Sequence, residues 1–260
     1  MITLLPPDLV PAVNSEIRKA STLRANLMLA AVLPGVALVA CTATALVSGP
    51  ADPGSDPATG AASIGLYLAI AAAILAAAVF GAVGAGAEYR YESMPVTALF
   101  TADRDRLVAS KLLVTGAIAL ATTFVVELVG LICLLGFGRG KVEFGMRLVT
   151  VLGGGLLAAT CWSLIGAGLA LMLRKSSIAI AALLGWLLIA EPLIWVVANA
   201  IGIGGVATLL PGSATIAAVA AGSFPDSDIL APTPAAVVVL LLWTIGSAGG
   251  GWWTLRTRDL

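Results

Sequence analysis

The polar residues best suited to chemistry or recognition form one stretch, residues 88–111, which reads EYRYESMPVTALFTADRDRLVASK. It is the longest polar segment between two apolar segments, and its acidic and basic residues are interleaved so that the local charge is balanced. Three apolar residues, Met94, Leu99 and Phe100, allow it to pack against another surface. A simple link between two membrane helices needs only a few residues. The length and composition therefore predict a docking element.

Two further carboxylates, Glu127 and Glu191, lie inside long apolar runs, and Pro192 follows the second of them. A charge at the centre of a bilayer costs about 2.5–3.5 kcal/mol on insertion scales, so such residues usually face a cavity or a partner. Pro192 also removes a backbone donor and leaves an opening in the helix nearby. We interpret both carboxylates as candidates for a translocation path or a subunit interface. The alternative is a protonated carboxyl group, or one that extends toward the outer surface.

Several kinds of catalytic site are missing from the sequence. There is no histidine, so histidine-based metal sites and histidine general bases are excluded. Residues 136–141 (GFGRGK) resemble a phosphate-binding loop, but Val142 follows the lysine and Leu135 stands where the first glycine is required. Residues 202–207 fit a loose dinucleotide pattern but follow an apolar run rather than a strand. We expect no enzymatic activity and no cofactor in this chain.

The composition is that of a membrane protein. Of the 260 residues, 60% are hydrophobic and only 11% are charged, and the mean hydropathy is +1.05, whereas soluble domains have about 25% charged residues. The net charge of +0 gives no basic field for nucleic acid. The three cysteines lie in apolar runs, where a thiol is most often a small buried hydrophobe.

Six apolar segments are long enough to cross a hydrocarbon core of about 30 Å, which takes about 20 helical residues. Because backbone groups cannot remain unpaired in lipid and the runs lack period-two alternation, we predict an all-α fold. The predicted spans are residues 25–47, 64–86, 112–135, 148–173, 178–200 and 235–253. Residues 14–24 are predicted to form a short interfacial helix with Asn14 or Ser15 as its cap. In the link 201–234, glycines and prolines separate short apolar runs, which predicts short re-entrant helices on the outer side.

The basic residues predict the orientation, since cytoplasmic links carry an excess of Lys and Arg. Three lie on one predicted side: Arg139, Lys141 and Arg147. Eleven lie on the other: Arg18, Lys19, Arg24, Arg90, Arg104, Arg106, Lys111, Arg174, Lys175, Arg256 and Arg258. This asymmetry predicts that both termini are cytoplasmic.

Two segments resemble those of a known family, the type 2 ABC transporter permeases, which are the membrane subunits of bacterial ABC exporters. Residues 14–29 (NSEIRKASTLRANLML) look like the connecting helix of that family. Residues 88–112 look like its segment between the second and third spans, with an acidic start, a Thr/Leu-rich helix, an Arg-containing turn and a Lys that opens the next helix. The layout of six spans, with Leu-Leu-Pro-Gly in the long fifth link, is similar along nearly the whole chain.

The resemblance implies a coupling helix over residues 88–101 that docks on a separate ATPase subunit. The residues it implies for this contact are Glu88, Arg90, Glu92, Met94, Leu99, Phe100 and Arg104. Two ATPase subunits, which would bind ATP and Mg²⁺, and a second permease would complete the transporter, in the bacterial plasma membrane with lipid around it. The permease would be a homodimer or part of a similar heterodimer.

Two other functions remain open from the sequence. An ion-coupled secondary transporter would use Glu127 and Glu191 as proton or ion ligands, although that class favours inverted repeats, which the two halves of the chain do not show. A membrane scaffold that transports nothing is the other alternative.

Overall fold

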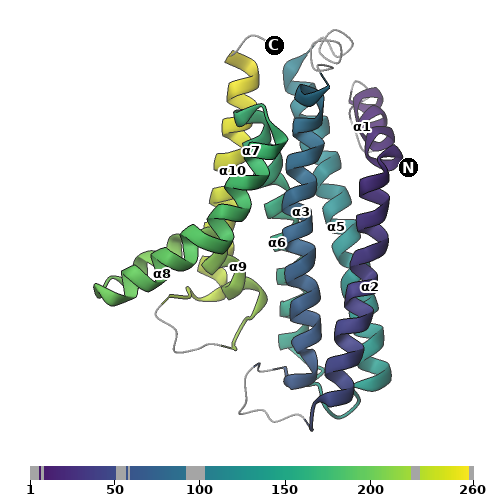
Figure 1. Ribbon diagram of the computed structural model, residues 1–260, viewed down its shortest axis with the longest axis vertical. Coiled ribbons are helices and arrows are strands. Elements are labelled where there is room, and N and C mark those ends of the chain that lie inside the picture. The colour runs from purple at the N-terminus through teal and green to yellow at the C-terminus, as the bar shows by residue number, and fades with distance from the viewer. Residues whose placement is uncertain are drawn as a thin grey trace.

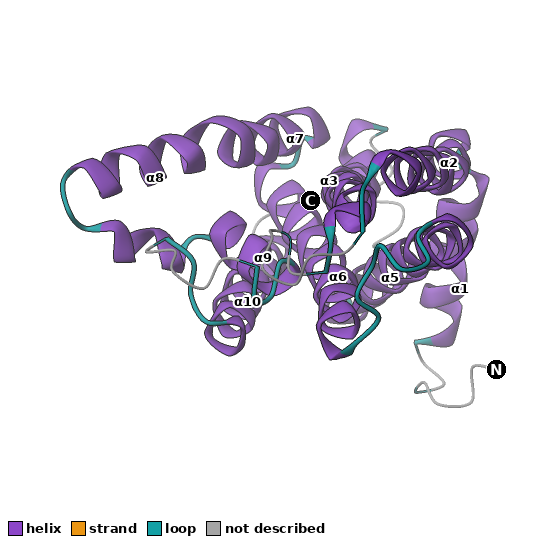
Figure 2. Ribbon diagram, turned by 90° about the horizontal axis from the view of Figure 1, so that it is seen from below, coloured by secondary structure: helices purple, strands orange, loops and turns teal. Residues whose placement is uncertain are grey.

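The computed structural model describes residues 6, 9–50, 57, 59–91, 103–223 and 229–257, and the side chain of Ala25 is not described. Within this part of the chain the regular structure is helical, with no strand (Figures 1 and 2). The elements are α1 (Val10–Thr22), α2 (Arg24–Val47), η1 (Ala61–Ser63), α3 (Ile64–Arg90), α5 (Arg104–Phe137), α6 (Met146–Leu173), α7 (Ser176–Gly185), η2 (Trp186–Ala190), α8 (Glu191–Ala200), η3 (Gly204–Leu209), α9 (Pro211–Val219) and α10 (Thr233–Thr257).

Six helical stretches are long and apolar enough to cross a membrane, as the sequence predicts. They are Asn26–Val47, Ala61–Arg90, Arg104–Phe137, Met146–Leu173, Ser176–Ala200 and Thr233–Thr257. The architecture is that of a multi-pass membrane protein. Helix α1 and the end of α10 lie toward the same end of the bundle (Figure 1), which we call the N/C end.

The largest differences from the predicted helix ends lie near the N/C end. Helix α3 continues to Arg90, and α5 already begins at Arg104, so both polar flanks of the predicted docking stretch belong to the long helices. Asp103 caps α5 by accepting a hydrogen bond from the Asp105 amide at 2.9 Å. Helix α1 begins at Val10, with Pro11 in its first turn, so that Asn14 lies inside the helix rather than at its cap.

Helices α3 and α6 cross closely at the centre of the bundle because small residues face one another. A Cβ atom on Gly81 would collide with the Ser163 carbonyl, and one on Gly166 with the Ala78 carbonyl. Such small residues let helix backbones approach in a membrane, where dispersion contacts rather than the hydrophobic effect stabilise the pair. The same device joins α6 to α10, where Gly168 faces the Ser247 carbonyl. The bundle thus forms a rigid frame around α6.

The fifth span differs from the others because it is built from three pieces and leans away from the bundle (Figure 2). Between α7 and α8 the chain makes a π turn over Trp186–Ala190. Pro192 follows immediately and has neither an amide hydrogen nor room for the carbonyl of the preceding turn. The widened turn accommodates the proline without ending the span.

Two of the three basic residues on the side predicted to be poor in positive charge have a structural use. Lys141 donates to the Ala45 carbonyl in the last turn of α2 at 2.8 Å, and the Arg139 guanidinium donates to the Leu135 carbonyl at 3.1 Å. Cations near helix C-termini satisfy carbonyls without an intrahelical partner and interact favourably with the helix dipole. These residues therefore serve the helix ends.

Candidate functional site

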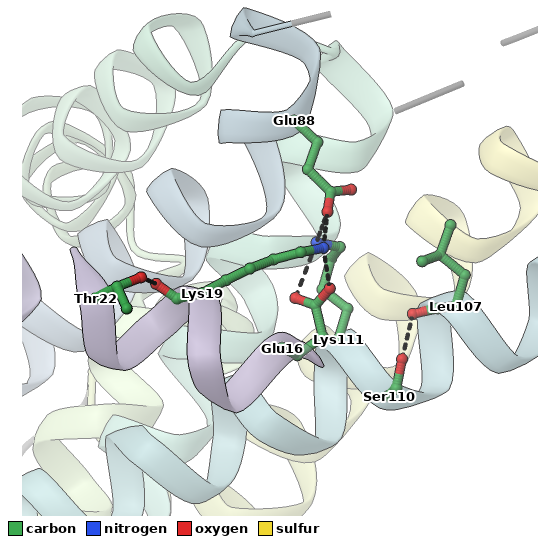
Figure 3. Close-up of polar contacts among 7 residues, drawn as sticks. All are labelled: Glu16, Lys19, Thr22, Glu88, Leu107, Ser110 and Lys111. Atoms are coloured by element: carbon green, nitrogen blue, oxygen red, sulfur yellow. Dashed lines mark hydrogen bonds and ion pairs between the residues drawn. The ribbon is translucent and has the colours of Figure 1, made fainter. Parts of the chain in front are cut away.

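Four charged residues from three helices form a network at the N/C end (Figure 3). The Lys19 ammonium of α1 lies 2.7 Å from Glu16 and 2.5 Å from Glu88 of α3. The Lys111 ammonium of α5 lies 3.2 Å from Glu16 and 3.3 Å from Glu88. Each carboxylate therefore meets two ammonium groups, and the charge of the network sums to zero. We call these four residues the charge network.

Most of the charge network is shielded from solvent, so each of its charges needs an oppositely charged partner. Lys111 is only 2% exposed, and Glu16 and Glu88 are also buried. Removing one partner of a buried ion pair leaves an uncompensated charge, which costs far more than the intact pair contributes. Lys19 lies at the rim. Partial burial disfavours its charged form, but its hydrogen bonds to Glu16 and Glu88 and their negative charges outweigh this and raise the pKa of Lys19.

A second set of contacts ties the start of α5 to the end of α10. The Arg104 guanidinium donates to the carbonyls of Leu255 at 3.0 Å and Arg256 at 3.3 Å. The Trp252 indole donates to the Asp105 carboxylate at 2.8 Å. Arg104 thus caps the C-terminus of α10 as well as beginning its own helix. Both helices that flank residues 92–102 are therefore held by neighbours. Helix α3 is held by α1 and α5, and the start of α5 is held by α10.

These contacts change the interpretation of two predicted docking residues. The Glu88 side chain is buried in the charge network, and the Arg104 guanidinium is bound to α10, so the placement of neither favours a surface contact with an ATPase. Arg90 is exposed, with its guanidinium 5.8 Å from the centre of the Tyr91 ring. The other predicted docking residues, Glu92, Met94, Leu99 and Phe100, lie outside the described residues.

Glu191, inside the fifth span, has a defined structural partner in α9. Its carboxylate accepts hydrogen bonds from the amides of Gly212 at 2.9 Å and Ser213 at 2.7 Å, and from the Trp186 indole at 3.0 Å. Gly212 and Ser213 are in the first turn of α9, whose amides have no partner within that helix. The Glu191 carboxylate, which is 1% exposed, therefore caps α9 from the fifth span. Its negative charge interacts favourably with the positive N-terminal end of the α9 dipole.

Gly212 gives the Glu191 carboxylate room to approach α9. A Cβ atom at position 212 would lie 2.7 Å from the Glu191 carboxylate, closer than real Cβ contacts allow. Helix α9 is held from its other sides as well, since the Trp162 indole donates to Thr215 at 2.8 Å and Gly154 of α6 gives room to the Ala218 carbonyl. The Leu-Leu-Pro-Gly sequence thus places a helix start where a carboxylate can approach it.

Glu127 lies in a different environment. It is 4% exposed within α5, and its Oε1 has no hydrogen-bond partner in the described part of the structure. A Cβ atom on Gly155 of α6 would collide with this oxygen, and one of its next contacts would be the Ile70 side chain of α3. The carboxyl group therefore occupies an apolar space between α3, α5 and α6 that a glycine provides.

The structure brings Glu88 together with two residues that the sequence did not single out as partners, Glu16 and Lys111. For Glu16 the sequence does indicate an ion pair with Lys19, because the two residues are three positions apart and lie on one side of a helix. No local pattern indicates that Glu88 and Lys111 pair, since they are 23 residues apart in the sequence and belong to different helices. Glu88 and Glu191 lie in separate sites, and Glu127 in a third.

Searches against protein-family models and against curated proteins give no match for this chain.

Proposed function

We propose that this protein is the membrane permease subunit of an ATP-driven ABC exporter and works with a separate ATPase subunit. The proposal rests on the resemblance of residues 14–29 and 88–112 to type 2 permeases. The six helices supply the membrane domain that such a subunit requires. ATP and Mg²⁺ would bind on two ATPase subunits, and a second permease would complete the substrate path. The cytoplasmic side of a bacterial plasma membrane would then be the N/C end.

The observation that supports this function best is the fixation of both flanks of residues 92–102. Glu88 connects the end of α3 to α1 and α5, while Arg104 connects the start of α5 to α10. A force applied to a segment between two such anchors is transmitted to four helices rather than absorbed by a loose link. Energy coupling needs an element whose arrangement both sites can bias. The coupling surface itself would be formed by Arg90, Glu92, Met94, Leu99 and Phe100, without Glu88 or Arg104.

The test is co-purification with an ATPase subunit carrying a Walker A motif, to be sought among the neighbouring genes, together with ATPase stimulation in nanodiscs. Replacing Leu99 and Phe100 together by Asp removes the apolar anchor, and we expect loss of both binding and stimulation. The matched control, Ala51→Asp with Ala58→Asp, adds the same charge to the link after α2 and should bind normally. Full binding and stimulation by the Leu99/Phe100 variant would show that this segment is not the coupling element.

A second function, ion-coupled transport, has one observation in its favour. Glu127 is a buried carboxyl group with an oxygen lacking a hydrogen-bond partner, which is the kind of group that binds a proton or ion inside a membrane. Glu191 is a weaker ligand for this purpose because three donors already occupy it. Uptake or efflux by the chain alone in proteoliposomes with an imposed proton gradient, abolished by Glu127→Gln, would favour this function over the ATP-driven one.

A further inference from the structure

Two adjoining cavities lie beneath α1 and between α2, α3 and α5. The first, which we call the apolar cavity, has a volume of about 280 Å³. The second, of about 320 Å³, also has a mostly apolar wall, and we call it the polar cavity because it reaches charged side chains. They share Ala20, Asn26 and Phe80 in their walls, so they lie directly beside each other. The apolar cavity is lined chiefly by alanine and larger aliphatic side chains, including Leu33 and Ala73. The polar cavity reaches the charge network at Glu16, Lys19 and Glu88.

The shape of this space is fixed by the bend between α1 and α2. Leu23 has an extended backbone, which ends α1 and redirects the chain before α2. The side-chain amide of Asn26 donates to the Ala20 carbonyl across this bend at 2.9 Å. The Lys19 ammonium connects α1 to Glu88 of α3. Helix α1 is therefore held as a roof over the space rather than lying freely on the membrane.

The dimensions match one lipid molecule. Along α3 the combined space extends from Ala73 to Glu88, which at about 1.5 Å per residue is about 22 Å. One leaflet has about 15 Å of hydrocarbon and a headgroup layer of roughly 5–8 Å. With the N/C end at the membrane surface, the apolar cavity would take an acyl chain and the polar cavity a headgroup.

The charge around the polar cavity indicates the kind of headgroup. Glu16, Lys19 and Glu88 of the neutral charge network line this cavity, and Arg18 and Arg24 are exposed nearby in the chain but do not line it. Lys19 lines the cavity and its side chain is 39% exposed, so it can still meet a phosphate. Basic residues at the membrane surface attract anionic lipid with about 1 kcal/mol each.

We propose that this space is a binding site for one anionic phospholipid, with an acyl chain between α2, α3 and α5 and the phosphate beside Lys19, where the exposed Arg18 and Arg24 add positive charge at the same membrane surface. The bound lipid would fix the angle of α1 against the bundle. This site does not depend on the proposed function, because it requires only the chain itself and a membrane.

The test uses native mass spectrometry of the full-length protein, titrated in detergent with phosphatidylglycerol or phosphatidylcholine. Ala30 lines the apolar cavity, and the adjacent Ala31 is exposed on the same helix but does not line it. We expect Ala30→Trp to weaken phosphatidylglycerol binding at least tenfold and Ala31→Trp to leave it unchanged. A second filling variant, Ala76→Phe, approaches the same cavity from α3 and should act like Ala30→Trp.

The headgroup is tested separately. Wild-type protein should bind phosphatidylglycerol at least fivefold more tightly than phosphatidylcholine, and Arg18→Gln with Arg24→Gln should remove most of this preference. Equal binding by the Ala30→Trp, Ala76→Phe and Ala31→Trp proteins would place the lipid elsewhere and overturn the site. Equal binding of the two lipids by wild-type protein would overturn the anionic headgroup. If the wild-type protein retained neither lipid, the proposed site itself would be overturned.

Discussion

Glu127 and Glu191 are both carboxylates inside membrane helices, yet the structure satisfies them very differently. Glu191 accepts three hydrogen bonds and caps α9, whereas one oxygen of Glu127 is buried without a partner. A glycine stands beside each: Gly212 allows a helix start to approach Glu191, and Gly155 gives Glu127 only space. Similar positions in the sequence therefore do not imply similar roles. Glu191 stabilises the structure by capping α9. Glu127 has no such structural contact for its Oε1 in the described residues and is the better candidate for a functional role.

The largest expected effect is on the satisfied carboxylate. Glu191→Leu leaves the amides of Gly212 and Ser213 and the Trp186 indole without their acceptor. Buried unsatisfied donors cost about 1–3 kcal/mol each, with hydrogen bonds in membranes at the low end of that range. We expect a loss of about 2–4 kcal/mol in the free energy of unfolding.

This loss is measured by equilibrium unfolding in mixed detergent micelles. The control is Glu191→Gln, which keeps one acceptor oxygen and the side-chain shape and should lose about half as much. If Glu191→Leu unfolds at the same denaturant concentration as the wild type, the cap on α9 contributes nothing to stability.

The next effect tests the approach of α9 to Glu191. Gly212→Ala introduces a Cβ atom against the carboxylate, so either α9 or the Glu191 side chain must move. Overpacking of this kind costs about 1–3 kcal/mol. Gly205→Ala is the control, because a Cβ atom there meets no other group within 4 Å. Thermal unfolding of both variants provides the measurement, and equal stability would contradict the tight approach.

A smaller effect on stability is expected in the charge network, where carboxylates are paired with lysines. The raised pKa of Lys19 means that its ion pairs stabilise the fold fully below the ordinary lysine pKa of 10.5 and lose that contribution as pH rises through the higher folded value. The stability difference between wild type and Lys19→Met should therefore be constant near neutral pH and shrink above about pH 10.5. Unfolding curves recorded between pH 8 and 12 would show it.

The control for this pH series is Lys175→Met, since Lys175 is exposed and has no ion pair in the described residues. A stability difference for Lys19→Met that persists undiminished to the highest pH would show that Lys19 acts through packing rather than charge.

The smallest effect on stability is expected at the unsatisfied carboxylate. Glu127→Leu removes a buried oxygen without a partner and replaces it with apolar volume, so unfolding should change by less than about 1 kcal/mol. Transport is the informative second measurement. A loss of transport without a loss of stability would show that the carboxyl group serves function, and a stability loss as large as that of Glu191→Leu would remove the distinction between the two residues.

The sequence by itself determined the membrane fold. Apolar runs of about 20 residues have few alternatives, because in lipid each backbone group must be paired within its own helix. For that reason all six predicted spans are present, with ends displaced mainly where polar residues follow. The sequence also indicated that Glu127 and Glu191 need an explanation, since a carboxylate in an apolar run is costly wherever it lies.

Only the tertiary structure decided which groups satisfy these charges. Glu88 pairs with Lys19, which is 69 residues away in the chain, and Arg104 binds Leu255, 151 residues away. A buried charge requires a partner, but the requirement does not name it, because any donor that packing brings near will serve. The docking role predicted for Glu88 and Arg104 remains a prediction. Both residues are polar and lie near a helix end, but in the structure their side chains bind neighbouring helices.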